Sequence, residues 1–197
     1  EIQTLLGADI QMVLDVCPPL PSPPKVVQAA VERTAAWAAR GRAAFVAGAA
    51  ERQDRGLEQA QFGISQGGTD VVLRAESARR TVDLGFDGYA IGGLSVGESR
   101  DEMLPALASA LEHLPEDQPR YLMGVGDPAS IVEAVALGVD MFDCVLPTRH
   151  ARHGTVLTSE GKLSIRRLEF ERDERPLDES CGCRVCARWS RSYLRHL

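Results

Sequence analysis

The sequence lacks several features that would assign it to a specialised class. None of its 197 residues belongs to an apolar run of the roughly 18 residues that a membrane-spanning helix needs. No basic stretch followed by an apolar one opens the chain, so we expect a cytoplasmic protein. Aromatic residues make up only 5%, while the hydrophobic share of 44% and the charged share of 25% are ordinary for a globular protein.

A net positive charge is also missing. The formal net charge is -6, which argues against indiscriminate binding to nucleic acid. The charge is unevenly distributed, however. Residues 144–197 contain 11 Lys and Arg and 7 Asp and Glu, whereas residues 1–143 contain 11 Lys and Arg and 21 Asp and Glu. An acidic body with a basic tail fits a chain that meets a polyanion at one end, although random clustering on a solvated surface gives the same pattern.

Apolar runs that end in polar or glycine-rich segments recur along the first 143 residues. They end at Asp15, at Gln66 to Gly68, at Gly92 and Gly93, at Gly124 to Gly126, and at Asp143. Because the runs are continuously apolar, they predict parallel strands buried on both faces. Two architectures remain open, a (β/α) barrel and an open doubly wound sheet. No complete G-x-G-x-x-G motif is present, so a dinucleotide site has weak support.

Helical spacing predicts helices between these strands, at 25–40, 70–84, 99–113 and 128–137. The expected buried face of the second helix consists of Val72, Ala75, Ala78, Val82 and Leu84. That of the third consists of Met103, Leu104, Leu107, Ala110 and Leu111. Asp127 is expected to cap the fourth.

The last third of the sequence has a different texture. "GTVLTSEGKLSIR" alternates around Glu160 and Gly161 and predicts a β-hairpin, and the chain ends in a basic helical segment, "ARWSRSYLRHL". Five cysteines, an odd number, speak against a disulfide framework. Cys181, Cys183 and Cys186 could surround one Zn²⁺ with a fourth ligand from elsewhere. The alternative is three metal-free thiols, which this close together would be an oxidation hazard.

Polar groups at the strand ends are the candidate site. Asp15 and Asp143 could cap helices or act as a nucleophile or general acid/base, and capping explains Asp143 poorly because a hairpin is expected after it. The glycine pairs could form tight turns, or let the backbone approach a flat base together with Asp15 and Gln66. A basic loop follows Asp143 and is either a phosphate clamp or a solvated surface; it contains Arg149, His150, Arg152 and His153.

Five motifs together resemble those of one family, bacterial-type tRNA-guanine transglycosylase, also called queuine tRNA-ribosyltransferase. In chain order they are "GISQGG", "IGGLSVGE", "YLMGVGDP", "GVDMFDCVLPTRHARHG" and "RPLDESCGCRVC". The resemblance covers nearly the whole chain and implies a (β/α)8 TIM barrel with an inserted zinc-binding subdomain. Residues 1–147 would be part of the barrel with the active site, and residues 148–197 the hairpin and a truncated zinc subdomain.

The resemblance also implies a reaction. In this family, guanine at the wobble position of tRNA with a GUN anticodon is exchanged for 7-aminomethyl-7-deazaguanine (preQ1) in queuosine biosynthesis, in a cytoplasmic homodimer. Asp143 matches the nucleophile that forms a covalent intermediate with the ribose. The residues that match base-binding positions are Asp15, Cys17, Gln66, Gly93, Leu94 and Met123. Arg149 and Arg152 match tRNA-binding positions. Cys181, Cys183 and Cys186 match three of four ligands of a structural zinc ion.

Three departures from the family pattern bear on this interpretation. Val16 stands where bacterial members have Glu. A Ser-Asp-Ser/Gly-Gly motif with another base-site Asp, and the histidine zinc ligand, are expected outside these residues, so we expect a fragment with about five of eight barrel strands. The resemblance also implies that Val96 and Cys17, which match bacterial members, favour the small base preQ1. The competing hypotheses are a non-catalytic accessory subunit of the same fold and a zinc-ribbon RNA-binding module on a metabolic barrel enzyme.

Overall fold

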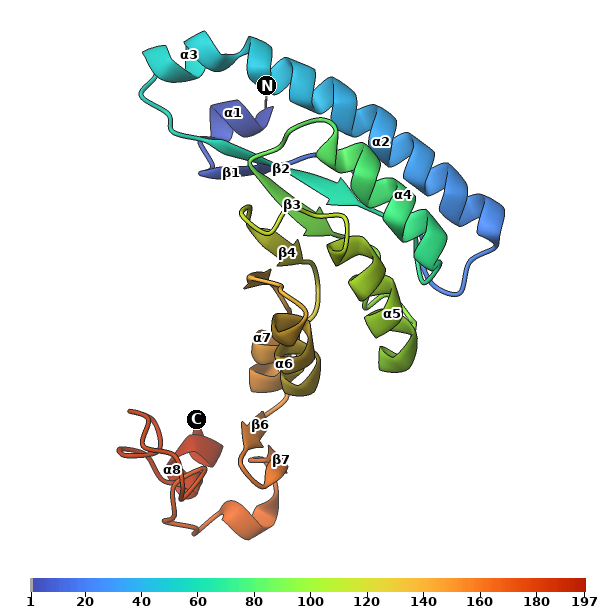
Figure 1. Ribbon diagram of the computed structural model, residues 1–197. Coiled ribbons are helices and arrows are strands. Elements are labelled where there is room, and N and C mark those ends of the chain that lie inside the picture. Colours follow the sequence, from blue (N-terminus) through green and yellow to red (C-terminus); the bar gives the residue numbers. More distant parts are fainter. Residues whose placement is uncertain (1) are drawn as a thin grey trace. The chain divides into compact units, whose positions relative to one another are not determined.

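The structure is a computed structural model that describes residues 2–197 (Figure 1). The chain forms two compact units, one ending at Cys144 and one spanning Val145–Leu197, which we call unit 1 and unit 2. The sequence suggested a change after residue 147. The division falls earlier because a helix that begins at Leu146 contacts the hairpin that follows it. Among the described residues, no helix is both long and apolar enough to cross a lipid bilayer.

Unit 1 is an α/β structure around one sheet of five parallel strands. The strands are β1 (Ile10–Met12), β2 (Ala60–Ser65), β3 (Gly88–Ile91), β4 (Arg120–Leu122) and β5 (Met141–Phe142). The helices are α1 (Ile2–Leu6), α2 (Pro24–Ala47), α3 (Ala49–Asp54), α4 (Val71–Val82), α5 (Arg100–Leu111) and α6 (Pro128–Ala136). The long predicted helices are therefore confirmed, with α2 longer than expected.

Strand order decides between the two architectures that the sequence left open. Each strand pairs with the next one in the sequence, in the order β1-β2-β3-β4-β5, and the order never reverses. A doubly wound sheet needs such a reversal and carries helices on both faces. Here α4 contacts α2 and α5, and these three helices lie on the same side of the sheet (Figure 1). The sheet is therefore a curled part of a (β/α) barrel.

The core of unit 1 lies between β3, β4 and the inner face of α5. Ile91, Leu107 and Leu122 are fully buried in one apolar cluster. The buried face predicted for α5 is confirmed, because Met103, Ala110 and Leu111 are also in this cluster and Leu104 packs against it. Such burial of apolar side chains is the main stabilising contribution to the sheet–helix layer.

The buried face predicted for α4 is partly wrong. Val72 is 69% exposed, whereas Arg74, Ser77 and Thr81 are among the residues that the helix buries. Periodicity places apolar residues against a sheet, but here Arg74 and Ser77 are needed at the sheet because they hold the loops that follow β2 and β3, while the hydroxyl of Thr81 donates to the carbonyl of Ser77 within the helix. Their contacts are described with the site.

Two carboxylates accept hydrogen bonds from backbone N–H groups at the N-terminal edge of the sheet. Asp87 precedes β3 and accepts a hydrogen bond from the backbone N–H of Gln61 at 2.9 Å. Asp140 precedes β5 and accepts from the N–H of Arg120 at 2.8 Å. Each carboxylate thus satisfies a backbone donor near the start of the preceding strand.

Asp127 caps α6 as predicted, with 3.0 Å between its Oδ1 and the N atom of Ser130.

Unit 2 contains α7 (Leu146–Arg152), the hairpin strands β6 (Thr155–Thr158) and β7 (Gly161–Ser164), a short 3-10 helix (Leu168–Phe170) and α8 (Arg191–His196). The hairpin is confirmed, and its register pairs Thr158 with Gly161. Two expectations are wrong. The segment with Arg149 and Arg152 is a helix and not a loop, because Pro147 stands in its first turn, where proline favours a helix start. The final basic helix covers only Arg191–His196.

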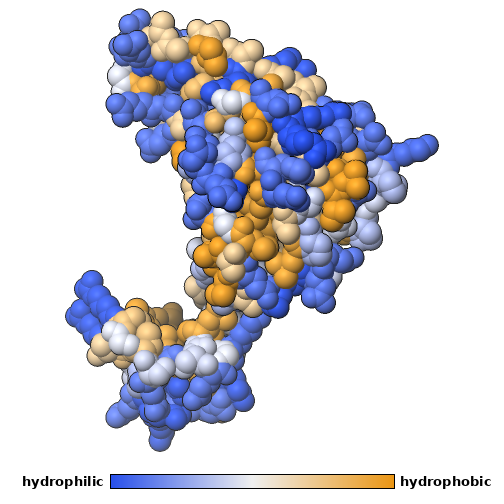
Figure 2. All heavy atoms as spheres, viewed as in Figure 1, coloured by the Kyte–Doolittle hydropathy of each residue, from blue (hydrophilic) through white to orange (hydrophobic). Residues whose placement is uncertain are grey.

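Apolar side chains reach the surface of unit 1 around β4 and α6 (Figure 2). On α6 itself, Val132 is 69% and Val135 is 54% exposed. A helix of a closed barrel packs such residues against the next helix of the ring.

Two glycine substitutions should change stability in opposite directions. A Cβ on Gly88 would overlap the ring of Phe62 on the neighbouring strand. Gly41 lies inside helix α2, and a Cβ there would make an ordinary 3.6 Å contact with Val13. Gly88→Ala should lower the free energy of unfolding by about 1–3 kcal/mol. Gly41→Ala should raise it by about 0.5–1 kcal/mol. Urea unfolding of the full-length protein measures both, and equal shifts of the same sign would contradict this packing.

Candidate functional site

The predicted site residues follow consecutive strands of the sheet. Asp15 and Cys17 lie in the segment after β1, Gln66 directly after β2, Gly93 and Leu94 after β3, Met123 after β4 and Asp143 after β5. The carboxyl ends of parallel strands meet at one edge, and this edge carries the sites of barrel proteins.

Asp15 and Gln66 form the centre of the edge. The Nε2 atom of Gln66 donates to Oδ2 of Asp15 over 2.6 Å, which fixes the orientation of the amide. Gln66 is fully buried, and its Oε1 has no hydrogen-bond partner among the described residues. A buried carbonyl oxygen without a donor is costly, so this oxygen is available to a ligand that offers an N–H group.

The glycine pair after β3 makes room for these side chains. An added Cβ on Gly92 would lie 2.7 Å from Nε2 of Gln66 and 3.3 Å from Oδ2 of Asp15. Gly93 has a φ of 67°, and an added Cβ there would overlap Oε1 of Gln66, so a side chain would be both strained and obstructed. Glycine at both positions is therefore required by the packing of Gln66 and Asp15 as well as by a tight turn, and the approach of this backbone to a flat base stays a prediction.

Three residues that hold this edge were not found from the sequence. Arg74 donates to the carbonyls of Gly68 (2.7 Å), Gly92 (2.6 Å) and Gly93 (2.9 Å). Ser77 accepts from the backbone N–H of Gln66 at 2.9 Å. Thr34 of α2 accepts from the N–H of Val16 at 2.9 Å, beside Asp15. The sequence did offer one signal for Arg74 and Ser77. These two polar residues lie three positions apart and therefore on the same side of α4.

Cys17, Leu94 and Met123 differ in what they can offer a ligand. Cys17 is exposed, and the pKa of its thiol is raised, mainly by partial burial and then by the charge of Asp15, so the neutral thiol dominates at neutral pH. Leu94 is 2% exposed, so its backbone is the part available to a ligand. Met123 packs against the core, and its N–H donates to the carbonyl of Ile91 at 3.1 Å.

Asp143 is held by two donors. The hydroxyl of Tyr121 donates to Oδ1 at 2.7 Å, and the backbone N–H of Gly124 donates to the same oxygen at 2.8 Å. Although a helix follows, its N-terminal cap is Val145, so Asp143 has no capping role. Burial raises the pKa of the Tyr121 phenol to about 12, together with the hydrogen bond and the charge of Asp143. The carboxylate is exposed and oriented, as a nucleophile or base must be.

In unit 2, the cationic side chains lie on α7. Arg149, His150 and Arg152 occupy its last turn, and His153 is the C-terminal cap. Cations at this end also complement the helix dipole, which is the structural alternative to phosphate binding. Arg149 and Arg152 are exposed and can reach a ligand from unit 2.

The three cysteines of the C-x-C-x-x-C motif come together. The sulfur atoms of Cys181, Cys183 and Cys186 all lie within 4.8 Å of one another, which suits a shared metal ion. Hydrogen bonds, first that from the backbone of Cys186, lower the pKa of Cys183 to about 7. His196 does not join this group among the described residues.

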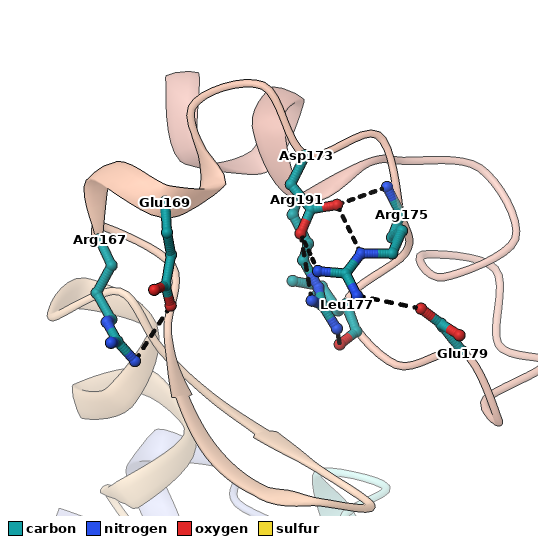
Figure 3. A network of polar contacts seen from close by, with 7 residues as sticks. All are labelled: Arg167, Glu169, Asp173, Arg175, Leu177, Glu179 and Arg191. Carbon is teal, nitrogen blue, oxygen red and sulfur yellow. Dashed lines mark hydrogen bonds and ion pairs between the residues drawn. The ribbon is translucent and has the colours of Figure 1, made fainter.

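A network of ion pairs supports the loop that leads to these cysteines (Figure 3). The carboxylate of Asp173 accepts from Arg175 at 2.8 Å and lies 3.3 Å from the guanidinium of Arg191. Arg191 also donates to the carbonyl of Leu177 at 3.2 Å and is 9% exposed. The hydrogen bonds and both arginine charges hold the pKa of Asp173 far below its usual range, so this network is charged at neutral pH.

Asp178 connects the same loop to the hairpin. It accepts from the backbone N–H of Ser159 in the hairpin turn at 2.6 Å and from the N–H of Ser180 at 2.9 Å. These bonds lower its pKa to about 2. The hairpin turn and the residue before Cys181 are thus tied to one carboxylate.

The fold and these groups define a class of protein. It is an α/β protein of the barrel type, with carboxylates, an amide and backbone donors at the carboxyl ends of its strands and a separate thiol cluster. The family model described as Queuine tRNA-ribosyltransferase matches residues 1–197, and the chain belongs to this family. The resemblance seen in the sequence is thereby confirmed.

Curated relatives agree with the family match. Proteins named Queuine tRNA-ribosyltransferase from Sphingopyxis alaskensis, Halothermothrix orenii and Bacillus subtilis are 54%, 53% and 51% identical over 197 residues. These residues are 100% of this chain and 52%, 50% and 50% of the three relatives. The chain therefore spans about half the length of the curated relatives it matches.

The Tyr121 phenol should report the charge of Asp143. In Asp143→Ala the pKa of Tyr121 should fall from about 12 toward its ordinary value but not reach it, because burial, the largest cause, remains. The measurement is an absorbance titration of tyrosinate in the full-length protein, with Tyr121→Phe to assign the signal. An unchanged midpoint would mean that Asp143 does not contact the phenol in solution.

Proposed function

We propose that the protein exchanges guanine at the wobble position of tRNA with a GUN anticodon for 7-aminomethyl-7-deazaguanine (preQ1). Membership of the family supports the reaction class. The observation that carries the proposal is the exposed carboxylate of Asp143, oriented by Tyr121 and Gly124 at the carboxyl end of β5.

Asp143 is the proposed nucleophile. Its carboxylate attacks C1′ of the ribose, the bond between C1′ and N9 of guanine breaks, and N9 leaves with the electron pair and takes up a proton. The incoming base then loses its N9 proton, bonds to C1′ and releases the carboxylate. Two displacements preserve the configuration of the sugar and divide one difficult step into two. The target base has to leave its stack before the attack.

The base is proposed to bind between the loops that follow β1 to β4. Asp15 accepts N–H groups of the base edge, the free Oε1 of Gln66 accepts another, and Met123 packs on the flat face. Gly93 and Leu94 contribute backbone groups. Cys17 stands beside Asp15 as a neutral thiol, which suits contact with an uncharged base.

Unit 2 is proposed to bind the anticodon loop and one structural zinc ion. Arg149 and Arg152 are exposed cations that can contact phosphates. Cys181, Cys183 and Cys186 fit zinc, because their sulfur atoms converge and thiolate is a preferred ligand. Zinc would cross-link this loop and has no part in the exchange. We further propose a cytoplasmic homodimer, as for an enzyme that acts on tRNA.

A non-catalytic accessory subunit is the second hypothesis. Such a subunit has no need for an oriented carboxylate at β5 or for an unsatisfied buried amide oxygen at the base site, and this chain has both. Covalent trapping of tRNA separates the two hypotheses.

Asp143→Ala in the full-length protein should abolish exchange and adduct formation. The affinity for tRNA should stay within about fivefold of wild type, because one exposed, screened charge contributes little. Exchange is measured as labelled guanine incorporated into tRNA, and the adduct on a denaturing gel. Asp101→Ala, which removes an exposed carboxylate from α5, is the control and should behave as wild type. An adduct formed by Asp143→Ala would transfer the nucleophilic role to another acid.

Cys183→Ser should remove zinc. Freshly purified, reduced full-length protein should contain one Zn²⁺ per chain, and the variant should lose it and unfold at a lower temperature, because bound metal stabilises the folded state. Elemental analysis and thermal unfolding measure the two effects. The control is Cys17→Ser, a cysteine outside the cluster, which should keep its zinc. A metal-free wild type would contradict the zinc site.

A further inference from the structure

Arg74 is a buried cation whose partners are all neutral. It is fully buried on the sheet side of α4, and it donates to the carbonyls of Gly68, Gly92, Gly93 and, at 3.3 Å, Ser65. Among the described residues it has no ion-pair partner. Burial lowers its pKa to about 10, so the guanidinium remains charged at neutral pH although the site opposes the charge. The charge of Glu98 offsets part of this effect, but it makes no ion pair with Arg74, and a buried charge without a direct ion pair is costly, which argues for a role beyond packing.

The contacts of Arg74 determine where two backbone donors point. In a trans peptide the C=O and N–H groups point in opposite directions. Because the carbonyls of Gly92 and Gly93 point at Arg74, the N–H groups of Gly93 and Leu94 point away from it. The direction agrees with the effect of the Gly93 N–H on the Cys17 thiol, whose pKa it lowers. Two adjacent donors thus face the side of Asp15, Cys17 and Gln66.

We propose that Arg74 is a positioning residue that presents the N–H groups of Gly93 and Leu94 to the exocyclic oxygen of a 6-oxopurine. The inference rests on the proposed function and deepens it. A carbonyl at C6 accepts two such donors, whereas a purine without oxygen at C6 leaves them unpaired. The charge of Arg74 also polarises both peptides, which strengthens hydrogen bonds to a base that becomes electron-rich as its bond to ribose breaks.

A role limited to stability is the alternative, and selectivity distinguishes the two. Arg74→Met removes the charge and all its donors but keeps most of the volume. Arg74→Lys keeps the charge but cannot reach the same carbonyls in a fork. Arg80→Met is the control, since Arg80 is an exposed residue of the same helix that pairs with Glu76.

The experiment measures binding of guanine and 2-aminopurine, and KM values for guanine and tRNA, in the full-length variants. Arg74→Met should lose at least about tenfold in guanine affinity, as expected for one strong hydrogen bond, while 2-aminopurine affinity and the KM for tRNA change little. Arg74→Lys should lie between wild type and Arg74→Met, and Arg80→Met should match wild type. Thermal unfolding confirms that each variant is folded.

Other outcomes have distinct meanings. A folded Arg74→Met with wild-type preference for guanine over 2-aminopurine overturns the inference, as does an equal loss for guanine, 2-aminopurine and tRNA. If Arg74→Met does not fold, Arg74→Lys decides, and unchanged guanine selectivity in that variant overturns the inference. A wild-type protein that binds no guanine would instead refute the proposed function, and the inference with it.

Discussion

The hydrogen bonds of one buried guanidinium hold together the edge of the sheet that carries the candidate site. Arg74 reaches from α4 to the loops after β2 and β3, and these loops contain Gln66 and Gly93. Since its acceptors are backbone carbonyls, the arrangement depends on loop geometry and not on the side chains of these loops. The glycines follow from it, because the backbone must approach both the guanidinium and the amide of Gln66. The polar inner face of α4 has the same cause.

In the proposed function the two units differ in the charge of the groups that they would offer to tRNA. In unit 1 a base would meet an amide, a thiol and backbone donors beside one carboxylate, which are groups suited to reading hydrogen bonds at short range. In unit 2 the cations of α7 are exposed, and interactions with phosphates act at longer range and weaken with salt. The cysteine cluster and the Asp173 network keep the loop of unit 2 compact where it buries few apolar side chains. Each unit therefore relies on a different source of order.

The sequence predicted features that depend on local pattern. The strands, the long helices, the hairpin and the position of Asp143 after β5 follow from apolar runs, periodicity and turn residues. The contacts of Arg74, Thr34 and Tyr121 did not, because each joins residues from different elements, and even the polar pair Arg74 and Ser77 on α4 does not reveal which loops it holds. Helix α7 was missed because its basic residues were interpreted as a loop, and the charge pattern is the same in both. The strand order, which excluded the doubly wound sheet, is likewise a long-range property.

Two aromatic rings, Phe62 in β2 and Phe86 in the loop before β3, constrain how this protein can evolve. The ring of Phe62 occupies the space beside Gly88 on the next strand, and the ring of Phe86 occupies the space beside Gly63. A larger residue at Gly88 is tolerable only after the ring of Phe62 has shrunk, and one at Gly63 only after both Phe86 and Thr81 have shrunk. A smaller residue in place of either ring first opens a void. Amino-acid substitution at these positions therefore has to pass through a destabilised intermediate, and each glycine should be inherited together with the ring that faces it.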